Sequence, residues 1–153
     1  MIITIETKEV LFDIADKSHL EVASITDAEA RYRAEAGTDK GEEVERALTS
    51  SRAALDQLLF KYLVPDQDGE GSNDPGFPQY FTYTLRLSER RGAGKAQALA
   101  DTMHSYLVNL TLAKFYHSVA QEQLASMREG LATADAQLLT KLINTKQPPY
   151  IKL

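Results

Sequence analysis

The middle of the chain carries the clearest repeat of apolar positions. Val44, Leu48, Ser51, Leu55, Leu58 and Tyr62 follow one another in alternating steps of four and three residues. This spacing places them along one side of a helix, where they can pack on a core. Asp39 with Glu42 three residues later is a capping-box pattern for its start. Pro65 is expected to end the helix, because proline lacks a backbone donor and clashes with the preceding turn.

The C-terminal half predicts two more helices. The first begins at Ala96 and has two adjacent apolar stripes, one of Leu99, Met103, Tyr106, Leu107 and Leu110 and one of Val108, Leu112, Phe115 and Val119. A helix with apolar residues around so much of its circumference lies at the centre of the fold, or is covered by another subunit. The second carries Leu124, Met127, Leu131, Leu138, Leu139, Leu142 and Ile143, with Gly130 as a position for a bend. It should stop before Pro148, which leaves residues 147–153 as an extended tail.

The N-terminal region predicts a short extended segment and two shorter helices. Residues 1–6 are rich in Ile and Thr, and Thr7 can cap a helix that ends near residues 18–20. Thr26 and Glu29 have capping-box spacing, and Gly37 is a candidate C-cap for the helix between them. Because this second segment has few apolar residues, we expect a short, exposed helix.

One segment alternates its side chains instead of following a helical period. In the stretch "YFTYTLRLSERR", which begins at Tyr80, one face is Phe81, Tyr83, Leu85 and Leu87 and the other is Tyr80, Thr82, Thr84 and Arg86. It follows residues 66–78, which are acids, glycines and prolines typical of a surface loop. A lone strand is unstable, so it must pair with the N-terminal "IITI", with part of its own loop, or with a strand of another copy.

These patterns predict a mainly α fold of four to five helices in a bundle-like core, with a small β-hairpin or strand element around residues 80–88. No internal repeat or domain-sized linker interrupts the chain of 153 residues, so we expect one domain. In this domain residues 1–37 form an N-terminal arm and residues 38–146 form the helical core, which includes loop 65–79.

Composition and charge exclude several functional classes. A net charge of −5 disfavours specific nucleic-acid recognition, which needs clustered Lys and Arg. The chain has no cysteine, and neither a signal peptide nor a run of about 20 apolar residues is present. We therefore expect a cytoplasmic protein without a membrane partner.

Candidate chemistry is sparse, and we predict no enzymatic activity, no cofactor and no metal site. Asp66, Asp68, Glu70 and Gly71 match early positions of a calcium loop, but Phe77 stands where the bidentate Glu belongs, and cation binding by loop 66–74 stays a side hypothesis. His19, His104 and His117 lack metal-ligand spacing. Lys95 follows two glycines without the spacing of a phosphate-binding loop.

Five segments follow one another over about residues 39–153: "LDQLLFKYLVP", the acidic loop, "YTLRLSERR", "ALADTMHSYLVNLTLAKFYHSV" and "LLTKLINTKQPPYIKL". Their order and general character resemble those of small helical proteins encoded among the structural genes of tailed phages and prophages, in particular head-tail connector, or neck, proteins. Residues 1–37 do not share this resemblance. The resemblance implies a non-enzymatic subunit that forms a ring between portal and tail proteins and becomes part of the virion.

By this resemblance the alternating segment reaches a neighbouring subunit and the tail docks outside its own core. The candidate subunit-contact residues are Tyr80, Phe81, Tyr83, Leu85, Arg86, Arg90, Arg91 and Tyr150. The alternative is a bacterial helical adaptor or regulatory module, which would bind a protein partner through the exposed face of the long helix that begins at Ala96. It would be a monomer or dimer with one persistent apolar patch.

Overall fold

The protein is mainly helical, with a small antiparallel sheet, as the sequence predicts. The computed structural model describes residues 1–64, 77–88 and 94–145. In these ranges the elements are β1 (Ile2–Glu6), α1 (Thr7–Val22), α2 (Ala28–Ala34), the 3-10 turn η1 (Thr38–Lys40), α3 (Gly41–Leu59), β2 (Tyr80–Thr84), α5 (Ala96–Ser118) and α6 (Glu122–Asn144).

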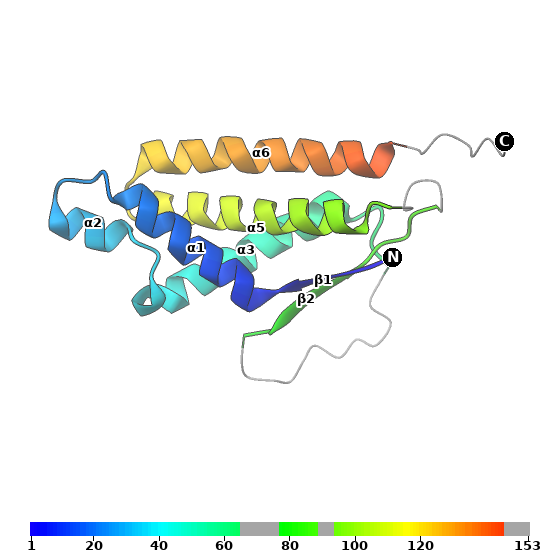
Figure 1. The fold of residues 1–153 in the computed structure, drawn as a ribbon, viewed down its shortest axis with the longest axis horizontal. Helices are drawn as coiled ribbons and strands as arrows, with labels where there is room; N and C mark the ends of the chain where they lie inside the picture. Colours follow the sequence, from blue (N-terminus) through cyan, green and yellow to red (C-terminus); the bar gives the residue numbers. More distant parts are fainter. Residues whose placement is uncertain (65–76, 89–93, 146–153) are drawn as a thin grey trace.

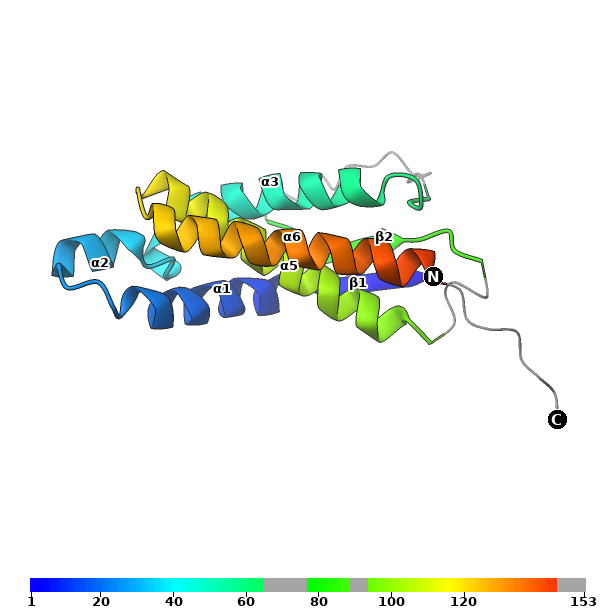
Figure 2. The same ribbon diagram turned by 90° about the horizontal axis from the view of Figure 1, so that it is seen from above.

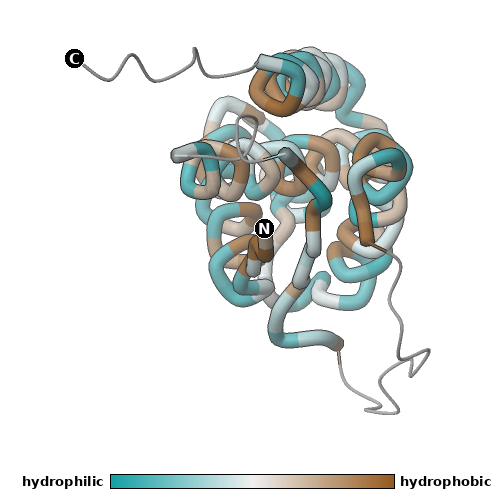
Figure 3. Tube along the Cα trace, turned by 90° about the vertical axis from the view of Figure 1, so that its right-hand side faces the viewer, coloured by the Kyte–Doolittle hydropathy of each residue, from teal (hydrophilic) through white to brown (hydrophobic). Residues whose placement is uncertain are grey.

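The long helix α5 lies at the centre of the fold (Figure 1). Helices α1 and α3 flank it on one side together with the sheet, while α6 lies along its other side (Figures 1 and 2). The end view in Figure 3 shows α6 at one surface, separated by α5 from the layer that contains the N-terminus. The two apolar stripes of α5 are buried except for Leu110 and Val119, which are partly buried, because α5 has neighbours on both sides.

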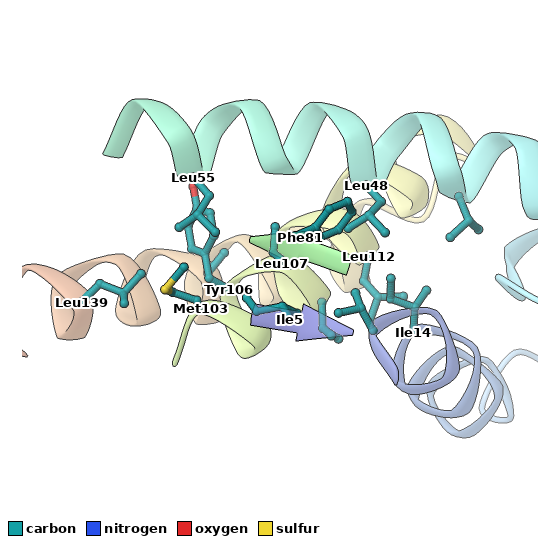
Figure 4. Packing of buried hydrophobic residues seen from close by; sticks show 14 of the residues in the cluster. Ile5, Ile14, Leu48, Leu55, Phe81, Met103, Tyr106, Leu107, Leu112 and Leu139 are labelled. Atoms are coloured by element: carbon teal, nitrogen blue, oxygen red, sulfur yellow. The ribbon is translucent and has the colours of Figure 1, made fainter. Parts of the chain in front are cut away.

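The hydrophobic core forms where α1, α3, α5 and the sheet meet (Figure 4). Leu48 and Leu55 of α3 point toward Phe81 of β2 and Leu107 of α5, and each of the four is at most 1 % exposed. Ile14 brings α1 to the same core without any exposed surface. The helical stripe of α3 and the inner face of the sheet therefore bury each other.

The alternating segment pairs with the N-terminal strand of its own chain. β1 and β2 are antiparallel, with Ile3 opposite Tyr83 and Ile5 opposite Phe81. Leu85 adds an isolated bridge to Leu63, so the end of α3 also reaches the sheet. Of the three pairings that the sequence leaves open, the structure adopts the one with "IITI".

Several predicted helix boundaries differ from the observed ones. α1 continues to Val22, beyond the end predicted near residues 18–20. The cap of α2 is Asp27 and not Thr26, because the Asp27 carboxylate accepts a hydrogen bond of 3.2 Å from the backbone N–H of Glu29. Glu35, and not Gly37, is the C-cap of α2. The two caps of α2 therefore lie one and two residues from the predicted ones.

The start and end of α3 also differ from prediction. Residues 38–40 form a 3-10 turn, so α3 begins at Gly41 without a capping box. It ends at Leu59, before Pro65, because the chain turns there to form the Leu63 bridge to Leu85. α6 continues through Gly130 without interruption, so the bend allowed for at this glycine is not used.

Candidate subunit-contact surface

The two faces of the sheet have opposite environments, and three predicted contact residues lie on the buried one. Phe81, Tyr83 and Leu85 are 1–2 % exposed and pack in the core of their own chain. Burial inside their own chain does not support these three residues as subunit contacts, which stay a prediction. The alternation correctly indicated one apolar face, but sequence could not say that the chain itself covers it.

Tyr83 on the inner face lies near two charged residues of α3. Burial raises the pKa of the Tyr83 phenol, and the carboxylate of Asp56 on α3 raises it further. The guanidinium of Arg52, also on α3, lies 4.5 Å from the centroid of the Phe81 ring, within the range of a cation–π contact. A charged substitution at Tyr83 would therefore disrupt the core before it tested any contact between subunits.

The outer face of the sheet is open to solvent and retains two of the predicted contact residues. Tyr80 is 55 % exposed, and Arg86 is exposed just beyond the end of β2. Opposite Tyr80 and its neighbours lie Ile2, Thr4 and Glu6 of β1. Ile2 is 69 % exposed. The outer sheet face therefore combines exposed apolar side chains with threonines.

Sequence reasoning did not identify Ile2 and Thr4 as surface residues. The available signal was the alternation in "IITI", which implies that alternate residues face opposite ways. Ile3 and Ile5 point inward at 3 % exposure, so Ile2 and Thr4 point outward. Their position opposite β2 depended on a pairing that the sequence left open.

The outer edge of β1 is the second notable feature of the sheet. Met1 and Leu85 exchange two backbone hydrogen bonds, of 3.0 and 2.7 Å. Because hydrogen-bonded and non-hydrogen-bonded pairs alternate in an antiparallel ladder, the N–H and C=O groups of Ile2 and Thr4 point away from β2. Within the described ranges no backbone group bonds to them. Such an edge can accept another strand.

The far edge of β2 is partly occupied by the segment that follows α3. The N–H of Val64 donates to the carbonyl of Thr84 at 2.9 Å, and the N–H of Arg86 donates to the carbonyl of Tyr62 at 2.6 Å. The two edges of the sheet are therefore different, and among the described residues β1 has the longer open one.

A further exposed apolar surface lies on α6. Met127, Leu131 and Leu138 are each 44 % exposed, although they belong to the apolar pattern that predicted this helix. Ala125, Ala132, Leu139 and Ile143 form the buried face of α6. The apolar surface of α6 is therefore wider than the part that α5 covers.

A buried ion pair holds α6 to α1. The Arg128 guanidinium pairs with the Glu21 carboxylate, and their side chains are only 10 % and 14 % exposed. Glu21 also accepts a 3.0 Å hydrogen bond from the hydroxyl of Tyr116 on α5. Burial lowers the pKa of Arg128 and raises that of Tyr116. One carboxylate thus joins three helices.

The same arginine continues into a polar cluster between α5 and α6. Arg128 donates a 2.6 Å hydrogen bond to the side-chain carbonyl of Asn109, whose amide donates to Asp135 at 2.8 Å. Ser105 donates to the same Asp135 oxygen at 2.8 Å. Because these bonds have fixed directions, they set the rotation of α6 about its axis and thereby decide which of its side chains face outward.

The three histidines each lie beside a carboxylate. His19 is 2.8 Å from Glu35, and His104 Nε2 is 2.6 Å from Asp13. His117 contacts two glutamates near the turn between α5 and α6. In the ranges that the structure describes, no group of three or more His, Asp or Glu residues is arranged to hold a metal ion.

Several predicted residues lie outside the described ranges. These are the candidate contacts Arg90, Arg91 and Tyr150, the acidic residues Asp66, Asp68, Glu70 and Gly71 of the calcium-loop hypothesis, and the tail 147–153. The contact and cation-binding hypotheses for these residues stay predictions.

Comparisons of the chain with known protein families, with curated proteins and with solved structures found no match. No helix in residues 1–64, 77–88 or 94–145 is both long enough and apolar enough to span a bilayer.

Proposed function

We propose that the protein is a non-enzymatic structural subunit that associates with copies of itself, resembling a head-tail connector, or neck, protein of a tailed phage or prophage. In this role it would form a ring between portal and tail proteins, first in the cytoplasm of the producing cell and then in the virion. The observation that carries the proposal is the outer sheet face, where Ile2 and Tyr80 are more than half exposed next to the open edge of β1.

Such a surface suits a head-to-tail contact. A strand edge can pair with an extended segment of a neighbour, while the exposed Ile2 and Tyr80 add apolar contact. When the same contact repeats around a rotation axis that closes, the product is a ring. The burial of Phe81, Tyr83 and Leu85 supplies a rigid base for this surface and takes these side chains out of the contact.

The test is the solution mass measured by light scattering over a wide range of protein concentration. The variant Ile2→Lys/Tyr80→Lys places two charges on the outer sheet face, and Ser50→Lys/Thr133→Lys adds the same charge at other exposed positions as a control. We expect a closed assembly of several copies that the first variant loses and the control keeps, with unchanged helical circular dichroism. A monomer at every concentration would contradict self-association.

A second candidate function is a helical adaptor or regulatory module that binds another protein. The half-exposed Met127, Leu131 and Leu138 favour it, because a persistent apolar patch on a monomer often marks a protein-binding site. This patch lies on α6 and not on α5, the long helix that the sequence pointed to, because α5 is largely buried. This alternative predicts a monomer or dimer in the mass measurement, with no larger assembly.

A further inference from the structure

The exposed apolar surface of α6 repeats with the seven-residue period of a coiled coil. The repeat runs through Leu124, Met127, Leu131, Ala134, Leu138 and Lys141, in alternating steps of three and four residues, and we call this set the α6 seam. The four middle members are exposed, Leu124 at one end is partly buried against the core of its own chain, and Lys141 at the other end is charged. Leucine recurs every seven residues in this repeat, at positions 124, 131 and 138. A seam of this kind on a helix surface is the pattern by which one helix packs lengthwise on another.

The seam faces away from the core because of where α5 holds α6. Ala132 and Leu139, each one residue after a seam leucine, are 3 % and 0 % exposed. Adjacent residues of a helix are about 100° apart around its axis, so burying these two turns Leu131 and Leu138 outward. The Arg128 contacts with Glu21 and Asn109 prevent α6 from rotating to hide them.

The charges along α6 favour a second copy of this chain over a strongly charged partner. Apart from Lys141 the seam is uncharged, and Gln123, Gly130 and Gln137 along one flank are uncharged too. The charged residues of the other flank, Arg128 and Asp135, are bonded to side chains of their own chain. Two chains of net charge −5 repel each other in general. Pairing through the seam avoids part of this repulsion, because neither the seam nor the uncharged flank places an acidic side chain against the second copy.

Lys141 also decides the direction of the pair. Parallel helices in register would place Lys141 against Lys141 of the second copy. In an antiparallel pair with Lys141 opposite Leu124 of the second copy, the two lysines are 17 residues apart along the helix axis. At 1.5 Å per residue, this separates the two ammonium groups by about 25 Å. This distance is well beyond the screening length of about 8 Å at physiological salt, and opposed helix dipoles add to the preference.

The sizes of the side chains match in the antiparallel arrangement. With Leu131 opposite Ala134 of the second copy, the symmetric contact also brings Met127 opposite Leu138. Apart from its own helix backbone and chain neighbours, Gly130 beside this centre has no atom within 4 Å of where a Cβ would lie, so the space there is open for an approaching helix. At the centre of the pair the large Leu131 thus meets the small Ala134, and on either side of the centre the apolar Met127 and Leu138 meet each other.

We propose that two copies of this chain pair through the α6 seam as antiparallel helices, with Leu131 of each against Ala134 of the other. The inference rests on the proposed self-association and names one of its surfaces. A two-fold symmetric contact is complete with two copies, so the α6 seam joins subunits only in pairs. In the proposed ring, the contacts that close the ring are those of the sheet. A strip about 25 Å long and about 10 Å wide buries less than the roughly 1,200 Å² of a stable interface, so the pair alone is weak and concentration-dependent.

Because the natural chain has no cysteine, disulfide formation can test the direction of the pair directly. Two full-length variants, Met127→Cys and Leu138→Cys, are oxidised separately and as an equal mixture. In the antiparallel pair, residue 127 meets residue 138, whereas two residues 127 are about 16 Å apart. Cα atoms must come within about 7 Å for a disulfide, so the cross-linked dimer should form in the mixture and not in either variant alone.

Cross-linking within each separate variant would overturn the inference in favour of a parallel pair. No cross-linking in the mixture, at concentrations where light scattering shows assembled protein, would also overturn it while leaving the proposed function intact. A chain that stays monomeric at every concentration would overturn both.

A substitution on the seam supplies a second readout. Leu131→Glu places two carboxylates at the centre of the pair and should raise the dissociation constant of the dimer at least tenfold. Thr133→Glu adds the same charge to an exposed position off the seam and should change it less than about twofold. Equal effects of the two substitutions, with helical content retained, would count against the seam.

Discussion

Replacing Arg128 with alanine tests whether the buried polar contacts hold α6 in place. The substitution removes the ion pair with Glu21 and the 2.6 Å hydrogen bond to Asn109. Glu21 then remains as a carboxylate whose side chain is 14 % exposed, with the Tyr116 hydroxyl at 3.0 Å as its remaining donor. A buried charge that loses its partner is costly because neither water nor a counter-charge replaces the lost contact.

The expected loss in free energy of unfolding is about 3 kcal/mol. Removing one member of a buried pair costs about 3–5 kcal/mol, and the remaining tyrosine contact places this case near the lower end of that range. For a chain of this size about 3 kcal/mol corresponds to a melting temperature lower by roughly 6–12 °C. The measurement is urea unfolding at pH 7 followed by far-ultraviolet circular dichroism.

Two comparisons make the measurement specific. Arg33→Ala removes an exposed arginine paired with Glu29 on α2, and should change stability by less than about 0.5 kcal/mol. Glu21→Gln/Arg128→Met removes both charges at once and should lose less stability than Arg128→Ala. The reasoning is refuted if Arg128→Ala costs no more than Arg33→Ala.

Three further predictions concern the core, the turn between α5 and α6, and pH. Phe81→Ala should lower the free energy of unfolding by about 3–5 kcal/mol in the same assay, since the ring is fully buried, and a loss below about 1 kcal/mol would contradict its place in the core. Ala120 has a φ of 59°, in the left-handed region, so Ala120→Gly should raise stability by about 1 kcal/mol, and a loss would contradict this backbone conformation. His117 has Nε2 2.7 Å from Glu129 and Nδ1 2.8 Å from Glu122, contacts that raise its pKa above 6.5, chiefly through Glu129. Its contribution to stability is therefore complete below pH 6.5 and lost as pH rises through the folded-state pKa; an NMR titration should show a raised midpoint that falls in Glu129→Gln, and an unchanged midpoint would contradict the contact.

The helices were predictable because their signal is local. Leu48 and Leu55 recur at helical spacing, and a helix buries such a stripe against whatever core is present. The exact ends were less predictable, since Asp27 and Thr26 are both good capping residues and the energy difference between neighbouring caps is small.

The candidate contact surface depended on tertiary structure. Alternation in the segment from Tyr80 showed that it has two different faces, but Phe81 and Tyr83 look equally suited to a core and to a subunit contact. Only the pairing of β2 with β1 and the packing of α3 decided that these residues are buried and that Tyr80 and Ile2 are exposed.

The same division applies to α6. The sequence by itself determined that α6 is a helix with a recurring set of apolar residues, because periodicity is a property of neighbouring positions. Which of these residues meet α5 was decided by contacts between residues far apart in the chain, such as Arg128 with Glu21 and Asn109. Such contacts leave no local pattern, because their energy exists only after the chain has brought distant side chains together.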